Sequence, residues 1–155
     1  MSFESVRTFF RNCGLEDRLK IFDESSATVE LAAVALGCEP QQIAKTLSFL
    51  IGDQAILVVC AGNVKIDNSK YKTQFQTKAK MIPADQVKTK IGHPVGGVCP
   101  FAVNPEVKIY LDQSLKENDI VYPAAGTGNS AVELSIPELE KCLPTAKWID
   151  VCKPI

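Results

Sequence analysis

The sequence predicts an α+β fold, with helices packed around a largely antiparallel sheet. Apolar residues recur at helical spacing near the N-terminus, and two strongly apolar runs in the middle of the chain flank a turn, which is typical of a buried hairpin. Helical and strand patterns are mixed rather than strictly alternating. Since 155 residues is a common size for one domain, we expect a single domain over residues 1–155.

Two helices and one short strand are expected near the start of the chain. The first helix begins at Ser2, a good capping residue, and ends at Gly14. A strand is expected over residues 19–22. The second helix runs from Thr28, which can cap it, to Gly37. The apolar residues on one side of this helix are Leu31, Val34 and Ala35.

The middle of the chain predicts a hairpin and then two helices. Residues 45–51 and 55–60 are apolar runs on either side of a short polar turn. A lysine-rich helix is expected to begin at residue 67 or 68 and to end near Phe75, and another should run from Pro83 to Gly92.

The last third predicts an irregular loop, several strands and one helix. Residues 93–102 are too rich in glycine and proline for a regular element. The Ser135-Ile136-Pro137-Glu138 segment has the pattern of a capping box that starts a helix. Strands are expected at residues 107–111, 120–123, 131–134 and 147–151, with a glycine-rich turn at 124–129.

The charges are unevenly distributed along the chain. The 17 basic and 18 acidic residues give a net charge of −1, but residues 65–90 contain seven lysines and two acidic residues, a local charge of +5. Such a segment can bind a polyphosphate, and the alternative is a solvated surface with no partner. Because the segment contains no arginine and few aromatic residues, sequence-specific reading of bases is disfavoured.

Composition argues against disulfides, metals and membranes. The six cysteines form no C-x-x-C pair, and with a single histidine they offer no workable zinc ligands, so we expect reduced, buried thiols and no metal or other cofactor. The N-terminus is unlike a signal peptide, and no apolar run approaches the roughly 20 residues that span a bilayer. We therefore expect a cytoplasmic protein with no membrane partner.

Three features could carry chemistry, although standard motifs such as G-x-S-x-G and the P-loop are missing from the sequence. Lys45 precedes a very apolar strand, where its ammonium could bind a phosphate or ribose oxygen or stabilise negative charge; the alternative is an ordinary surface lysine. Residues 96–100 place several backbone N–H groups in succession, which could hold a carbonyl or an anion, or form only a tight turn. Cys99 and His93 could form a nucleophilic pair, but a buried or pocket-lining thiol is favoured because no helix begins after Cys99 to lower its pKa.

Several motifs resemble one known family. They occur in order within residues 20–145, and they are 35–37 (ALG), 42–47 (QIAKTL), 58–63 (VVCAGN), 67–70 (D-x-x-K), 96–101 (GGVCPF) and 125–126 (AG). Together they look like the YbaK/ProX family and the editing domain inserted in bacterial prolyl-tRNA synthetases. Several spaced motifs in the same order are far more specific than any one of them.

The resemblance implies a curved sheet or barrel surrounded by helices, and a trans-acting hydrolase. Its substrates would be mischarged tRNAs carrying Cys-, Ala- or Ser-type residues, on the proline tRNA. It implies a catalytic role for Lys45 and no protein nucleophile, with an ordered water or the tRNA's own hydroxyl groups completing the reaction. The residues implied around the substrate are Thr46, Gly96, Gly97, Val98, Cys99, Pro100, Gly126 and Thr127. The residues implied to contact tRNA are Lys65, Lys70, Lys72, Lys78 and Lys80.

The expected partners are therefore the acceptor end of tRNA and an aminoacyl-tRNA synthetase. Two other functions are compatible with the sequence. One is a non-catalytic tRNA-binding module or synthetase-associated factor with the same fold. The other is a hydrolase of small-molecule esters, whose activity would not depend on the lysine-rich segment.

Overall fold

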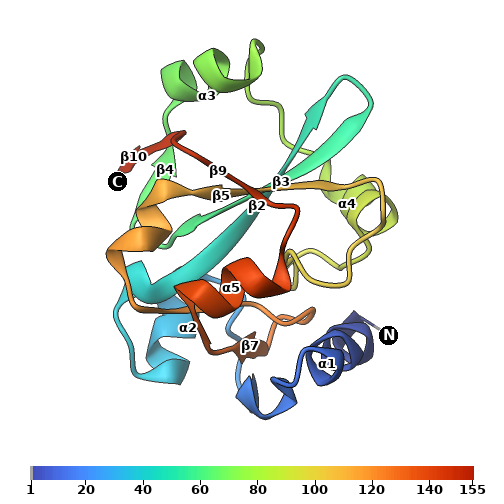
Figure 1. The fold of residues 1–155 in the computed structure, drawn as a ribbon, viewed down its shortest axis with the longest axis vertical. Coiled ribbons are helices and arrows are strands. Elements are labelled where there is room, and N and C mark those ends of the chain that lie inside the picture. The colour runs from blue at the N-terminus through green and yellow to red at the C-terminus, as the bar shows by residue number, and fades with distance from the viewer. Residues whose placement is uncertain (1) are drawn as a thin grey trace.

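The computed structural model describes residues 2–155 and has a curved six-stranded sheet with five α-helices around it (Figure 1). The predicted α+β class is confirmed. In spatial order the strands are β8 (Leu134–Ser135), β6 (Ile120–Pro123), β2 (Ile43–Ile51), β3 (Gln54–Ala61), β5 (Lys108–Asp112) and β9 (Lys147–Ile149). The helices are α1 (Ser2–Asn12), α2 (Val29–Leu36), α3 (Asn68–Phe75), α4 (Ala84–Ile91) and α5 (Ile136–Cys142).

The centre of the sheet is the predicted hairpin of β2 and β3, which pair in antiparallel register from Ala44↔Ala61 to Ile51↔Gln54. β6 and β8 are also antiparallel, whereas β2–β6, β3–β5 and β5–β9 are parallel, so the sheet is mixed. Two small antiparallel pairs lie outside it. They are β1 (Leu19–Ile21) with β7 (Ser130–Val132), and β4 (Val64–Ile66) with β10 (Cys152–Pro154).

Two helices, α2 and α5, begin at the hydrogen-bonded caps that the sequence predicts, whereas the Ser2 hydroxyl, expected to cap the first helix, forms a hydrogen bond with His93 instead. The Thr28 hydroxyl accepts a hydrogen bond from the N–H of Leu31 at the start of α2, and Gly37 ends that helix with a φ of 68°. At the start of α5, the Ser135 hydroxyl and the Glu138 carboxylate each accept from the other's backbone N–H. These caps fix where α2 and α5 begin.

The apolar side of α2 that carries Leu31 and Val34 is turned to solvent. These two residues are 46% and 82% exposed, so this side does not face the core. The buried residues of this helix are Ala32 and Ala33, which pack with Ile43 at the start of β2. Small side chains at these positions let the helix approach β2 closely, and this contact decides the orientation of α2.

The strand expected over residues 131–134 is in fact two strands with different partners. β7 pairs with β1 and β8 pairs with β6. At the change of partner, the N–H of Glu133 donates to the carbonyl of Arg18. The sequence pattern could not reveal this break, because only Glu133 separates the two strands.

The central hairpin separates two regions of the core. Val59 packs with Phe10 and Phe101 on one face, whereas its neighbour Val58 packs with Phe49 and Tyr71 on the other. Successive side chains of a strand point to opposite faces, so each residue of β2 and β3 belongs to one face or the other. No helix within residues 2–155 is long and apolar enough to cross a bilayer.

Candidate active site

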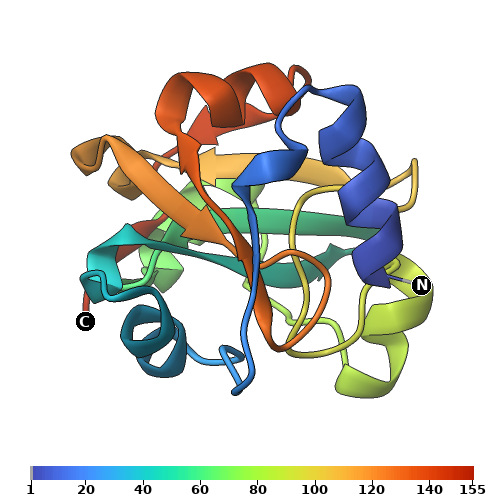
Figure 2. The same cartoon turned by 90° about the horizontal axis from the view of Figure 1, so that it is seen from below.

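A pocket of about 350 Å³ lies beside β2, between α2 and α4. Figure 2 shows these two helices on the same side of the sheet. The floor is formed by residues 43–48 of β2, one wall by the start of α2, the other by residues 81–87, and the roof by Val95, Gly96 and Val98. Lys45 and the glycine loop, which lie far apart in the sequence, therefore border the same cavity.

The roof of the pocket is held by a buried histidine. His93 is fully buried; its Nε2–H donates to the carbonyl of Phe101 (2.6 Å), so Nδ1 accepts a hydrogen bond from the Ser2 hydroxyl in α1. Burial lowers the pKa of His93, which keeps the ring neutral in this arrangement. Through these two hydrogen bonds the histidine connects the loop at residues 93–102 to α1.

Gly97 brings the roof against the glycine-rich turn at residues 124–129. A Cβ at position 97 would lie 2.6 Å from the carbonyl carbon of Gly126 and from the backbone nitrogen of Thr127. Only glycine permits so close an approach of two backbones. This contact determines the distance of Gly96 and Val98 from β2.

Cys99 lies beneath the roof and not in the cavity. The thiol is fully buried, and burial raises its pKa to about 12, so it is not the thiolate that a nucleophile requires. Its sulfur lies 3.5 Å from Nε2 of His93, a nitrogen whose proton is already donated to Phe101. The geometry agrees with the interpretation of Cys99 as an inert thiol.

The other residues proposed around the substrate fall into two groups. Gly96, Val98 and Thr46 line the pocket, whereas Gly97 and Pro100 are buried outside its lining. Gly126 is also buried, and a Cβ at this position would lie 2.9 Å from the backbone carbonyl oxygen of Ser2. The Thr127 hydroxyl forms a 2.6 Å hydrogen bond with the hydroxyl of Ser130, which does line the pocket.

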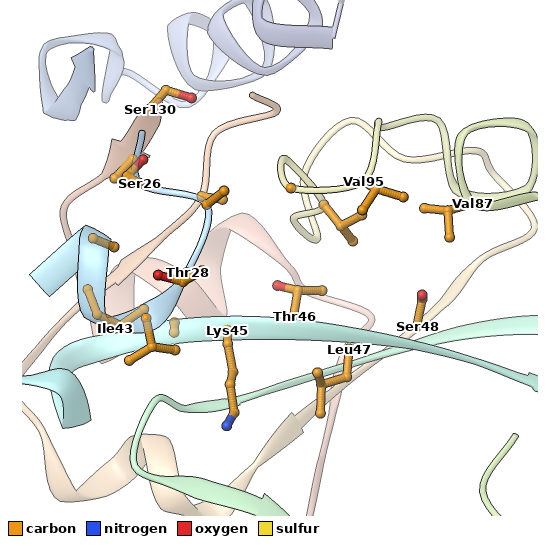
Figure 3. A pocket seen from close by; sticks show the side chains of 18 of the residues that line it. Ser26, Thr28, Ile43, Lys45, Thr46, Leu47, Ser48, Val87, Val95 and Ser130 are labelled. Atoms are coloured by element: carbon orange, nitrogen blue, oxygen red, sulfur yellow. The ribbon is translucent and has the colours of Figure 1, made fainter. Parts of the chain in front are cut away.

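The Lys45 side chain leaves the pocket. Figure 3 shows it on the opposite side of β2 from Thr46 and Ser48, as strand alternation requires. Its Nζ donates to the carbonyl of Val64 in β4. The residue therefore borders the cavity, but its ammonium and the roof amides do not converge in this conformation.

The pocket lining is neutral and rich in hydroxyl groups. Of the residues that line it in residues 2–155, only Lys45 has a charged side chain, and no carboxylate, histidine or cysteine is present. The hydroxyl-bearing residues are Ser26, Thr28, Thr46, Ser48, Tyr122 and Ser130. The family resemblance places Thr46 near the substrate, and the sequence assigns Thr28 only as a helix cap; sequence reasoning missed the other four.

The five lysines implied to contact tRNA lie around α3, at the end of the molecule away from α1, whereas Lys88 and Lys90 of the same segment lie on α4 (Figure 1). Lys65, Lys72, Lys78 and Lys80 are exposed, and Lys72 and Lys78 border a second hollow of about 450 Å³. Lys70 differs, since its Nζ donates to Asp150 (3.0 Å) and to the carbonyl of Cys152 (2.9 Å). The pairing of β4 with β10 sets Lys153 opposite Lys65 and adds a lysine to this surface.

The chain belongs to a family of editing domains. The family model described as "Aminoacyl-tRNA editing domain" matches residues 23–142, most of the chain. The chain is 47% identical over 154 residues to the uncharacterized protein YwhH of Bacillus subtilis (strain 168), covering 99% of this chain and 98% of that protein. The resemblance to the editing family is therefore confirmed.

Two further relatives connect the chain with prolyl-tRNA synthetases. It is 23% identical to the proline–tRNA ligase of Lactiplantibacillus plantarum over 90% of this chain, but it spans only 24% of that enzyme. A crystal structure of a proposed trans-editing enzyme for prolyl tRNA synthetase superposes with a TM-score of 0.88 and 26% identity, over 98% of this chain and 97% of the other. The fold is thus that of this structural relative.

Proposed function

We propose that this protein is a trans-acting aminoacyl-tRNA deacylase that works in the cytoplasm. Water would add to the carbonyl carbon of the ester that joins a wrong amino acid to the terminal ribose. The bond from that carbon to the ribose oxygen would break, and the ribose oxygen would take the proton. The observation that carries the proposal is the pocket shared by β2 and the 96–98 loop in a chain of the editing family.

The neutral lining favours an ester over a free amino acid. A free amino acid carries a carboxylate, and burying this group without a cation or several hydrogen bonds is unfavourable. The one charged lining residue, Lys45, directs its ammonium elsewhere. An aminoacyl ester has no such charge at its carbonyl, so it suits this cavity.

The pocket's size favours small amino acids. A cavity of about 350 Å³ is near the lower end of the roughly 300–1,000 Å³ that small-molecule sites occupy. It must also admit part of the terminal ribose. We therefore propose Cys-, Ala- or Ser-type residues as the groups removed, with the proline tRNA as carrier because of the relatives described above.

The lack of acid or base side chains in the described lining supports catalysis by positioning. Backbone N–H groups would stabilise the negative charge that develops on the ester oxygen, and an ordered water or a tRNA hydroxyl would supply the attacking group. No protein nucleophile is required. Such a mechanism depends on the shape of the roof and floor rather than on a catalytic triad.

The catalytic role of Lys45 remains part of the proposal and comes with a structural condition. To touch the substrate, its ammonium must leave the Val64 carbonyl. Lys45→Met keeps most of the apolar stem and removes the charge. Loss of turnover at an unchanged melting temperature would support substrate contact, whereas loss of both would show that Lys45 mainly joins β2 to β4.

The exposed lysines around α3 are proposed to bind the acceptor end of tRNA. Lysine–phosphate contacts give salt-dependent affinity that is largely independent of sequence. Lys65, Lys72, Lys78 and Lys80 are available for such contacts, whereas Lys70 already has partners. A synthetase that releases mischarged tRNA would be the natural second partner.

The proposal is tested by a panel of proline tRNAs charged with alanine, cysteine, serine or proline. Pure protein should release at least one of the first three faster than spontaneous hydrolysis and should spare prolyl-tRNA. A deacylase must also lose turnover when the roof is displaced by Gly97→Ala and keep it in Gly128→Ala, the matched control. No release of any member contradicts the proposed activity.

A second candidate, a non-catalytic tRNA-binding module, is favoured by one observation. The pocket lining in the described residues holds no carboxylate, histidine or cysteine, and the Lys45 ammonium lies outside it. This candidate predicts salt-dependent tRNA binding with no release from any panel member. It also predicts that Gly97→Ala leaves tRNA affinity unchanged.

A further inference from the structure

One stretch of the β2 edge is open where it passes the pocket. On one side β2 pairs with β3 along its length, but on the other side its pairing with β6 ends at Ala44↔Pro123. Farther along, the carbonyl of Ser48 accepts from the N–H of Ile82, and the N–H of Leu50 donates to the carbonyl of Lys80. The edge is therefore covered before and after Thr46.

The backbone of Thr46 points toward this opening. In an antiparallel strand the N–H and C=O of alternate residues point to the same edge. Since the backbone groups of Ser48 and Leu50 point away from β3, those of Thr46 do so as well. Neither β6 nor the segment at residues 80–82 pairs with Thr46.

The side chain of Thr46 adds a third unused group. Its Oγ1 is buried from solvent and has no hydrogen-bond partner in the described structure. Figure 3 shows the Thr46 side chain on the pocket side of β2, with Thr28 and Val95 across the cavity. Buried polar atoms are nearly always paired, so an unpaired hydroxyl beside a cavity is a candidate contact for a ligand bound there.

The gap has room for one residue and no more. An exposed strand edge binds a partner by exchanging N–H and C=O hydrogen bonds, and a peptide would need several positions in a row. Here the neighbouring positions are occupied by residues 122–123 of β6 and by residues 80–82. A single aminoacyl group carries both required elements, an amino N–H and a carbonyl oxygen on adjacent carbons.

We propose that the backbone of Thr46 binds the aminoacyl group as if it were a one-residue antiparallel strand. The α-amino group donates to the Thr46 carbonyl, and the ester carbonyl accepts from the Thr46 N–H, which then stabilises the developing oxyanion. The hydroxyl of Thr46 provides a third contact to the same ligand. The inference rests on the proposed deacylase function and names the substrate feature that this site recognises: a free α-amino group.

The first test compares alanyl-tRNA with propionyl-tRNA, which lacks only the α-amino group. Each rate is divided by the rate of spontaneous hydrolysis, because the amino group itself makes the ester more labile. The normalised rate should be at least about tenfold higher for alanyl-tRNA. Equal normalised rates would overturn the inference while leaving the deacylase function intact.

Failure of the proposed function can be told apart from failure of this inference. If the protein cleaves no member of the tRNA panel, binding of amide-linked alanyl and propionyl analogues of the terminal adenosine is measured by NMR. Stronger binding of the alanyl analogue, with shifts at the Thr46 amide, supports the site. Equal binding, or no shift at that amide, rejects it.

A pair of substitutions isolates the backbone contact. Thr46→Val removes the hydroxyl but keeps the N–H and C=O, so the preference for alanyl-tRNA should persist. Thr46→Pro removes the N–H, which is not used in pairing with β3, and should lower kcat about 10²-fold or more below Thr46→Val. Equal activity of two folded variants contradicts the inference; if circular dichroism shows that Thr46→Pro is unfolded, the alanyl–propionyl comparison on the native protein decides.

Discussion

Replacing Gly97 with alanine tests how the roof of the pocket is built. The new Cβ would lie 2.6 Å from the carbonyl carbon of Gly126 and 2.6 Å from the backbone nitrogen of Thr127. Non-bonded carbon atoms prefer separations of about 3.5–4.0 Å, so the two backbones must move apart by roughly 1 Å. Because both contacts are with backbone atoms, no side-chain rotation can relieve them.

The expected effects follow from this displacement. Overpacking of this kind costs about 1–3 kcal/mol, which for a chain of this size lowers the melting temperature by roughly 2–12 °C. The loop that carries Gly96 and Val98 would move with Gly97. A shift of about 1 Å at a site that works by positioning can reduce turnover about 10²-fold.

Gly128→Ala is the matched control, because Gly128 lies in the same turn but has space for a side chain. Its Cβ would be 3.6 Å from the Cβ of Ala27 and 3.9 Å from the carbonyl oxygen of Gly96, which are ordinary contacts. Thermal unfolding by circular dichroism should change by about 2 °C or less. If Gly97→Ala unfolds and deacylates like Gly128→Ala, the inferred contact between loop and turn is wrong.

Three other outcomes are expected. Lys72→Ala should reduce the slope of log K for tRNA binding against log salt concentration by about one unit. Lys70→Ala should reduce it by less, because Lys70 already binds an aspartate and a backbone carbonyl. Equal reductions would contradict this. Burial lowers the pKa of His93, so below about pH 6.5 the unfolded state binds the proton more readily than the folded state does. The folded state therefore loses stability as the pH decreases below this value. Melting temperatures at about pH 5 and 7.5 should therefore differ more in the native protein than in His93→Gln, and an equal difference would refute the linkage. Since burial raises the pKa of Cys99 to about 12, iodoacetamide should modify exposed Cys13 much faster than Cys99, and Cys99→Ala should remain active; rapid labelling of Cys99 in the folded protein would count against its burial.

Local signals in the sequence predicted many of the elements correctly. Thr28 and Ser135 cap α2 and α5, and Gly37 ends α2, because each of these effects depends on hydrogen bonds within four or five residues. The hairpin of β2 and β3 was also predictable, since a short turn joins two apolar strands. The expectation of one domain over residues 1–155 stays a prediction.

Contacts between remote segments were not predictable in the same way. The pairing of β4 with β10 joins residues near 65 to residues near 153, and neither short strand has a marked pattern of its own. The burial of α2 through Ala32 and Ala33, rather than through Leu31 and Val34, depends on the space beside Ile43. Such choices are decided by packing, which periodicity along one segment does not contain.

The sequence by itself determined the fold class, the helix ends, the central hairpin and the family, because these depend on local hydrogen bonding, on periodicity and on ordered motifs. Only the tertiary structure decided that the Lys45 ammonium points to Val64 and that Thr46 faces the cavity with unused polar groups. The physical reason is that an open strand edge is defined by where its neighbours stop. The pairing of β6 with β2 ends at Ala44, and residues 80–82 bind the same edge of β2 from Ser48 onward.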